Sequence, residues 1–178
     1  QERLQAEQSG SSRIVWHPEL LEAMRDPKIR QLATTQEQLY ASRQESLRAD
    51  LQAIEEHVQG QQGQLQAFAV ILSSRRNQLD LLNDELKSTG DLVKEGYAPR
   101  NRQLELERMV ADTQASIAEL IGNTTRTQRA IAELRQRAIV RKQEDRKELE
   151  SQMAEVEREV EGDGEKFRSA RADLGRTE

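Results

Sequence analysis

Apolar side chains recur along most of this chain at intervals of three and four residues. Such spacing places them on one narrow face of an α-helix, which is the arrangement typical of a coiled coil. The pattern predicts two long helices and no strands. The first helix has an apolar face of Ile29, Leu32, Leu39, Leu47, Leu51, Ile54, Val58, Leu65, Phe68, Leu72, Leu79, Leu82 and Leu86. The second has Leu106, Val110, Thr113, Ile117, Leu120, Thr124, Thr127, Ile131, Leu134, Ala138, Leu149, Met153, Val156, Val160, Phe167, Ala170 and Leu174.

Capping residues mark the ends of these helices. Asp26-Pro27 is a strong helix start, because aspartate caps the free N–H groups of the first turn and proline fits the first helical position. We predict the first long helix over residues 27–89, a turn over 90–99 and the second long helix over 100–174. Gly162 and Gly164 weaken the second helix locally, but the apolar face keeps its phase across them, so helix is expected there.

The N-terminal segment, residues 1–26, is predicted to form an elbow before the first long helix. Residues 1–8 are interpreted as the frayed end of a helix, which the sequence SGSS then breaks. Pro18 can open a short helix over residues 18–25. Because the chain begins without methionine, we expect a piece of a larger protein, with residues 175–178 as a tail that leads to a further domain.

The two apolar faces match each other level by level if the chain reverses at Glu95-Gly96. Facing residues then have numbers that add to a nearly constant value. Both faces also carry a run of four-residue steps at the matching level, and such a stutter must be shared by two helices that stay in register. The expected pairs are Leu82–Leu106, Leu79–Val110, Leu72–Ile117, Phe68–Leu120, Val58–Ile131, Ile54–Leu134, Leu51–Ala138, Leu39–Leu149, Leu32–Val156 and Ile29–Val160.

The predicted fold is therefore all-α: a long antiparallel two-helix coiled-coil hairpin with a short N-terminal helical elbow packed at its base. The register places Arg43 opposite Asp145 as an ion pair inside the apolar face, where polar pairs tend to fix register. Extended to the base, it places Phe167 against Leu21 and Leu174 against Ile14 and Val15. Trp16 is expected to cover this packing.

Composition supports helices that bury one stripe. Of the 178 residues, 35% are hydrophobic, 3% are aromatic and 33% are charged, which is too polar for a compact core. The 27 basic and 32 acidic residues are mixed along the chain and leave a net charge of −5. Without a basic patch that contains aromatic residues, nucleic-acid binding has little support. No apolar run approaches the ~18 residues that a membrane span requires.

Candidate chemistry is sparse. The two histidines, His17 and His57, are far apart along the helices and have no carboxylate at a metal-binding or catalytic spacing. The chain has no cysteine, and hence no thiolate ligand or disulfide. We expect no enzyme activity, no metal, no cofactor and no small-molecule ligand, because two paired helices enclose no pocket that excludes water.

The turn is the most informative part of the sequence. A turn between antiparallel helices requires only 2–5 residues. Here GDLVKEGYAPRN places Leu92, Val93 and Tyr97 where the paired helices cannot cover them. Apolar residues at such an extremity favour a contact with a partner over a simple corner.

The segment LVKEGYAPRNRQLELER, residues 92–108, resembles the hairpin tip of HlyD-type membrane fusion proteins, the periplasmic adaptors of bacterial type I secretion systems. The start of the chain, RLQAEQSG followed by HPELL and DP, is also similar to that family. So is its end, ADLGRTE. The resemblance covers essentially the whole chain and is most specific at the turn and at the two ends.

This resemblance implies a function in protein export. Such adaptors are anchored in the inner membrane of Gram-negative bacteria and form hexamers. They link an ABC transporter to a TolC-like outer-membrane channel, so that unfolded cargo such as a protease or lipase crosses the periplasm. The hairpin tip that docks the channel would consist of Leu92, Gly96, Tyr97, Pro99 and Arg100. The transporter would contact parts of the protein outside this chain.

Two alternatives remain at this point. Drug-efflux adaptors carry Arg, Leu and Ser at spaced tip positions, where this chain has Ser88, Leu92 and Pro99. Only the leucine matches, which favours the secretion branch. A structural coiled-coil spacer is the other alternative, and in that case substitutions in the turn would be silent.

Overall fold

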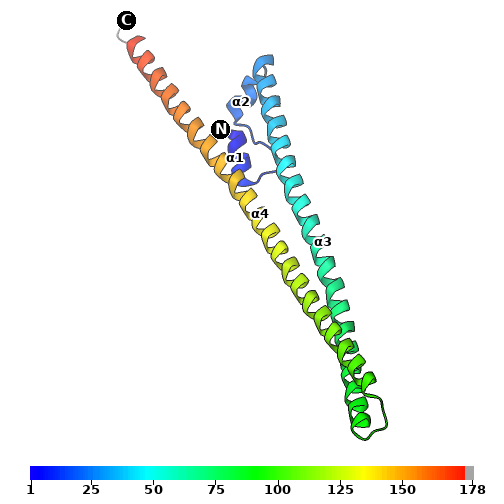
Figure 1. Ribbon diagram of the computed structural model, residues 1–178. Helices are drawn as coiled ribbons and strands as arrows, with labels where there is room; N and C mark the ends of the chain where they lie inside the picture. The colour runs from blue at the N-terminus through cyan, green and yellow to red at the C-terminus, as the bar shows by residue number, and fades with distance from the viewer. Residues whose placement is uncertain (175–178) are drawn as a thin grey trace. The chain divides into compact units, whose positions relative to one another are not determined.

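The computed structural model describes residues 1–174, with side chains as far as residue 172, and it confirms the all-α hairpin predicted from the apolar pattern. These residues form four helices and no strand (Figure 1). The two long helices, α3 and α4, run in opposite directions and are joined by a short turn. The helices are α1 (Glu2–Ser9), α2 (Pro18–Ala23), α3 (Pro27–Lys94) and α4 (Arg100–Leu174).

Local capping explains where the first helices begin and end. The Asp26 carboxylate accepts a hydrogen bond from the Lys28 N–H at 2.8 Å, so α3 begins at the predicted aspartate–proline start. Helix α1 ends at Ser9 and is capped by Gly10, whose φ of 65° is readily reached by glycine. Helix α2 begins at Pro18 and ends at Ala23, two residues before the predicted end, because the chain turns toward Asp26.

Helix α3 continues five residues beyond its predicted end. Gly90, interpreted from the sequence as the start of the turn, lies inside the helix. A single glycine costs a helix only about 1 kcal/mol, and Val93 extends the apolar face by two further turns beyond Leu86, so the helix continues to Lys94. Helix α4 likewise runs without a break through Gly162 and Gly164.

The chain divides into two compact units. The turn unit is Ile54–Arg137 and contains the turn between α3 and α4. Its core confirms the predicted register, because Val58 clusters with Ile131 and Leu134, and Ile54 packs against the same cluster. On the α4 side of the turn, Leu106 is completely buried.

Two threonines are also buried in the turn unit, although they stand where a coiled coil favours apolar residues. Thr113 and Thr127 are 6% and 7% exposed. The Thr113 hydroxyl donates to the carbonyl oxygen of Met109 at 2.8 Å, one turn earlier in the same helix. This local bond allows the hydroxyl to be buried without a partner across the hairpin.

The base unit is Gln1–Ala53 together with the chain from Ala138 on. It differs from the sequence prediction, because α1 is not a frayed end. Leu4 and Ala6 of α1 are buried, and Ala6 clusters with Ile14 of the following loop and with Tyr40 of α3, with Trp16 packed against them. Two apolar residues in an eight-residue helix are too few to reveal this docking in a periodicity search.

Several base contacts predicted from the register are absent. Phe167 and Leu21, predicted to pack together, are 68% and 54% exposed. Leu32 and Val160 are also exposed, so the pairs Leu32–Val156 and Ile29–Val160 do not form packed layers. The reason is that α3 and α4 separate in the base unit, where α1 lies beside both of them and α2 lies beside α3 (Figure 1). The predicted contact of Leu174 falls on a side chain outside the described residues.

Candidate functional site

The turn between α3 and α4 has a well-defined backbone. The Gly96 N–H donates to the carbonyl oxygen of Val93 at 3.1 Å, and the Tyr97 N–H donates to that of Leu92 at 2.8 Å. This pair of bonds is a Schellman motif, and it satisfies carbonyl groups that the end of a helix leaves free. Gly96 has a φ of 81°, the left-handed conformation that the motif requires at this position.

Side chains around the turn point largely into solvent. Tyr97 is 80% exposed and Leu92 is 45% exposed. Pro99 precedes the first residue of α4, and Arg100 begins that helix. Arg100 is exposed and makes no ion pair with any residue that the structure describes. The five tip residues predicted from the resemblance are thus all within or next to the turn, although Leu92 belongs to α3.

The next cation along α4 differs from Arg100. Arg102 bonds to Glu85 of α3 at 2.6 Å and to Glu105 of its own helix at 2.9 Å. The hydrogen bond to Glu85 is the main cause that raises the pKa of Arg102 above its ordinary value. The Arg102 guanidinium is therefore already paired with carboxylates of the hairpin. Arg100 is therefore the cation at the start of α4 that is available to a partner.

The composition of the turn is suited to contact with a macromolecule. Tyrosine and arginine are enriched in the binding hot spots of proteins, and an exposed leucine beside them adds apolar contact surface. Among residues 1–174, no three His, Cys, Asp or Glu side chains converge as a metal site. Nor does any helix in that range combine the length and apolar character of a membrane span.

The second candidate predicted from the sequence lies in the base unit. Arg43 of α3 lies opposite Asp145 of α4, with Nη2 and Oδ1 3.8 Å apart. Their side chains are 19% and 27% exposed, so the pair is partly shielded from water. Its role in setting the register remains a prediction.

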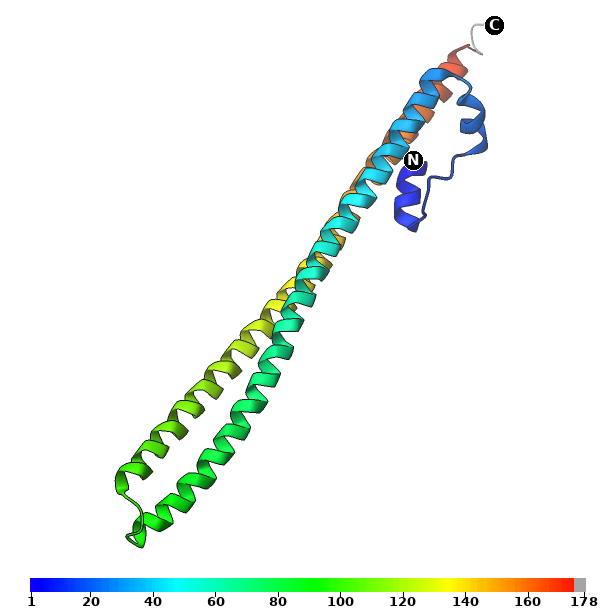
Figure 2. The same cartoon turned by 90° about the vertical axis from the view of Figure 1, so that its right-hand side faces the viewer.

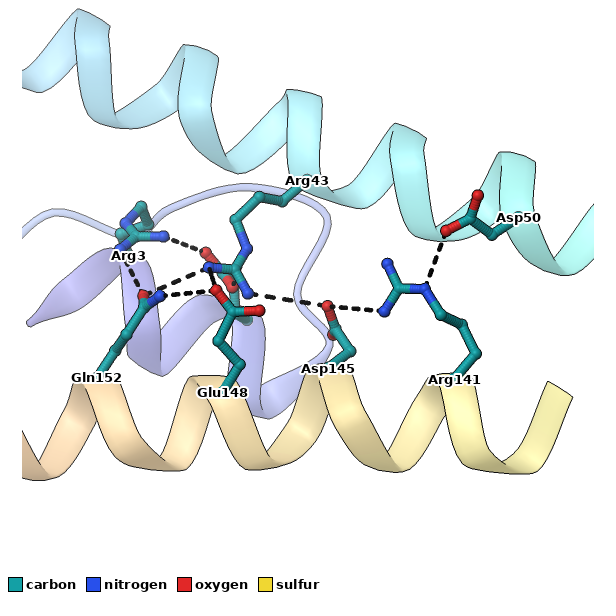
Figure 3. Close-up of polar contacts among 8 residues, drawn as sticks. Arg3, Arg43, Asp50, Arg141, Asp145, Glu148 and Gln152 are labelled. Carbon is teal, nitrogen blue, oxygen red and sulfur yellow. Dashed lines mark hydrogen bonds and ion pairs between the residues drawn. The ribbon is translucent and has the colours of Figure 1, made fainter. Parts of the chain in front are cut away.

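Arg43 has more partners than the sequence indicated (Figure 3). Its guanidinium also lies 3.5 Å from Glu148 of α4 and 3.5 Å from Glu7 of α1. Glu7 in turn pairs with Arg3 at 2.6 Å, and Arg3 donates to the Gln152 amide at 3.2 Å. The polar network therefore connects three helices. The only sequence signal for it was an arginine at an apolar position, which indicated one partner and not the docking of α1.

A neighbouring ion pair, Arg141–Asp50, is joined to this network through Asp145. Arg141 of α4 donates from Nε to Asp50 at 2.9 Å, and this hydrogen bond is the main cause that raises the pKa of Arg141 above its ordinary value. A raised arginine pKa means stability that is fully present at neutral pH and is lost only as the pH rises through that pKa, far into the alkaline range. The pair therefore contributes no pH sensitivity near neutrality.

Comparison with known proteins agrees with this geometry. The family described as AprE, long alpha-helical hairpin, matches residues 1–173. The alkaline protease secretion protein AprE of Pseudomonas aeruginosa (strain ATCC 15692) is 35% identical over 178 residues, which is 100% of this chain and 41% of AprE. The proteases secretion protein PrtE of Dickeya chrysanthemi is 31% identical over 155 residues, which is 87% of this chain and 35% of PrtE.

A solved structure is also similar. The crystal structure of the soluble domain of LipC, a membrane fusion protein of a type I secretion system, superposes with a TM-score of 0.94 at 29% identity. The match covers 98% of this chain and 65% of the LipC chain. The chain thus spans about two fifths or less of the curated relatives it matches, and it corresponds to their hairpin segment. The resemblance drawn from the turn motif is confirmed, and the chain belongs to the family of AprE-type long α-helical hairpins.

Proposed function

We propose that this chain is the hairpin of a periplasmic adaptor for type I protein secretion, and that its turn docks an outer-membrane channel of the TolC type. The observation that carries the proposal is the exposed Leu92–Tyr97 surface at the turn of a hairpin whose relatives are named for protease secretion. Exposed apolar residues on a rigid support are suited to a docking contact.

The geometry of the turn supports a docking role over a plain connection. The Schellman motif holds Tyr97 directly after Gly96, so the ring is presented by a hydrogen-bonded backbone. Arg100 adds a charge that no described residue neutralises and that suits an acidic group on the channel. Such a preorganised surface loses little conformational entropy on binding.

The remaining partners follow from the same proposal. The ABC transporter contacts parts of the adaptor outside this chain, and six adaptors surround the path of an unfolded protease or lipase. The whole assembly is anchored in the inner membrane, and the hairpin lies in the periplasm. The relatives AprE and PrtE are named for protease secretion, and this supports an adaptor of protein secretion over an adaptor of drug efflux.

A chimaera tests the docking role in cells. Residues 1–178 replace the matching segment of AprE in a Pseudomonas aeruginosa strain that lacks its own AprE, and secreted alkaline protease is measured. We expect secretion from the chimaera and at least a tenfold loss with Leu92→Asp or Tyr97→Ala. Tyr97→Phe keeps the ring and is expected to retain most of the secretion. Equal secretion by all variants would leave the turn as a mere connection.

Cross-linking identifies the partner directly. A cysteine at Glu95, an exposed position of the turn that leaves the Tyr97 ring in place, is expected to cross-link to the outer-membrane channel with a short bifunctional reagent. The matched control is a cysteine at Ser42, an exposed position near the other end of α3, which is expected to give no channel adduct. Adducts at Ser42 and none at Glu95 would contradict the proposed orientation.

A further inference from the structure

In the base unit, α3 carries two apolar edges that are offset by one residue. The buried edge consists of Ala33 and Tyr40, which are 7% and 5% exposed. The other edge consists of Leu32 and Leu39, which are 65% and 44% exposed. One residue corresponds to a rotation of about 100° around a helix of 3.6 residues per turn, so the two edges face different neighbours.

The buried edge packs against the N-terminal segment. Tyr40 clusters with Ala6 of α1 and with Ile14, and its hydroxyl donates to the carbonyl oxygen of Ser11. Trp16 packs on the same cluster. Figure 2 shows α1 beside α3 in this unit. The neighbour that buries Tyr40 is therefore α1 with the loop that follows it.

The exposed edge continues the coiled-coil pattern of the hairpin. Two ion pairs, Arg141–Asp50 and Arg43–Asp145, join α3 and α4 immediately before they separate. In the predicted register Leu32 meets Val156, although Leu32 is now exposed. A hollow of about 500 Å³ opens at the level of separation, and Leu39, Arg43, Asp145 and Gln152 are among its lining residues.

The exposed edge on α3 has a counterpart on α4. Val160 is 54% exposed, and the register places it opposite Ile29, within one helical turn of Leu32. Leu32 and Val160 thus stay exposed at neighbouring levels of the two arms, which indicates a packing that the sequence encodes and the observed arrangement leaves unformed.

We infer that the base unit has two alternative packings and that α1 selects between them. With α1 docked, Ala33 and Tyr40 are buried and the two arms stay apart. With α1 detached, the two arms close on each other, and Leu32, which lies on the same edge of α3 as Arg43, meets Val156 as the coiled-coil register continues. The apolar edge is thus covered by the opposite arm of the same chain.

Helix α1 is built to detach. It has eight residues, and helices shorter than about 12 residues are marginal in water without tertiary contacts. It buries only Leu4 and Ala6. Its polar links to the two arms are Glu7, which shares Arg43 with Asp145 and Glu148 of α4, and Arg3, which donates to Gln152 of α4. Arg3 and Glu7 pair with each other and leave together, and Arg43 keeps its partners on α4. No buried charge is stranded by the exchange, which keeps both packings accessible.

The exchange can be measured by disulfide formation in the 178-residue chain, which contains no native cysteine. Leu32→Cys and Val156→Cys form the reporter pair, because a disulfide requires Cα atoms within about 7 Å. Ala6→Glu releases α1 by placing a charge in the Ala6–Ile14–Tyr40 cluster. We expect intramolecular disulfide formation at least ten times faster with Ala6→Glu than without it.

Trp16 reports independently whether α1 has left. It is the single tryptophan, and its Nε1 donates to Glu37 at 3.0 Å when docked. Ala6→Glu is expected to shift its emission to longer wavelength while helical circular dichroism is retained. The matched control is Ala41→Glu, which adds the same charge at an exposed position of α3 and is expected to change neither signal.

Three results would overturn the inference. The first is a shifted Trp16 emission with no faster disulfide, because the arms would then stay apart without α1. The second is disulfides between two chains, because the apolar edges would then take a second copy. The third is an unshifted emission in both Ala6→Glu and Glu7→Arg, because α1 would then be a fixed part of the base.

Discussion

At the scale of single residues, the two glycines near the turn have opposite requirements. Gly96 has a positive φ, a backbone conformation that L-residues with a side chain rarely adopt. Gly90, in contrast, lies within α3 in helical conformation. An added Cβ at Gly90 would meet only the Gln103 amide, at 3.8 Å, which is an ordinary contact. From the sequence, both looked like turn residues, because composition does not distinguish a helical glycine from a capping one.

Substitution by alanine separates the two glycines. Gly96→Ala is expected to destabilise the hairpin by about 1–2 kcal/mol, because alanine is strained in the left-handed conformation. Gly90→Ala is expected to stabilise it by about 0.5–1 kcal/mol through higher helix propensity. Urea unfolding followed by circular dichroism measures both. A stabilising Gly96→Ala would mean that the Schellman turn is absent in solution.

Arg43 pairs with carboxylates on two other helices of the base unit, Glu7 of α1 and Asp145 and Glu148 of α4. Arg43→Met keeps the aliphatic stem but leaves three carboxylates short of a partner, so a loss on the order of 2 kcal/mol is expected in the free energy of unfolding. Arg146→Met is the control, because Arg146 pairs only with Glu150 on the exposed surface of α4. It is expected to change stability by less than about 0.5 kcal/mol. Similar losses in both variants would argue against a special role for the network.

At the scale of elements, the apolar pattern predicted the two long helices, their direction and their register. It failed where a third element enters. Leu32 and Leu39 continue the stripe in sequence, yet Ala33 and Tyr40 are the buried residues, because α1 approaches α3 from a different side. Periodicity indicates which faces of a helix can be buried. A short segment such as α1 has too few apolar residues to predict which face of α3 it will cover.

The buried threonines give a test at this scale. Thr113→Val replaces a buried hydroxyl that bonds only within its own helix, and burial of the added methyl is expected to stabilise the hairpin by about 0.8 kcal/mol. Thr125 makes the same local bond but is exposed, so Thr125→Val is expected to be nearly neutral. Thermal unfolding of the two variants makes the comparison. A destabilised Thr113→Val would indicate that this hydroxyl has a partner across the hairpin.

At the scale of the whole molecule, stability and the proposed docking are assigned to different residues. The cores of the two units consist of residues such as Val58, Ile131 and Tyr40, whereas the turn contributes exposed side chains. The tip residues were proposed through a family motif and not through their physical chemistry. Which of them would contact the proposed channel depends on the shape of that partner, and that information lies outside this chain.

Tyr97→Ala is therefore expected to affect the proposed docking without affecting the stability of the fold. With 80% of the residue exposed, its removal is expected to shift the midpoint of thermal unfolding by less than about 2 °C. The same substitution is expected to abolish channel cross-linking from a cysteine at Glu95 in the turn. A large fall in the unfolding midpoint would instead assign Tyr97 to the fold.

The tight turn at Gly96 also has a kinetic consequence. Pairs next to it close loops of about 20 residues, whereas pairs at the base close loops of more than about 100, and each doubling of loop length adds about 0.6 kcal/mol of entropic cost. Folding is therefore expected to start at the turn and to proceed toward the base, each closed layer shortening the loop for the next. Amide protons around Leu106 would then gain protection before those around Tyr40, and the segment that contains α1 would be the last to order.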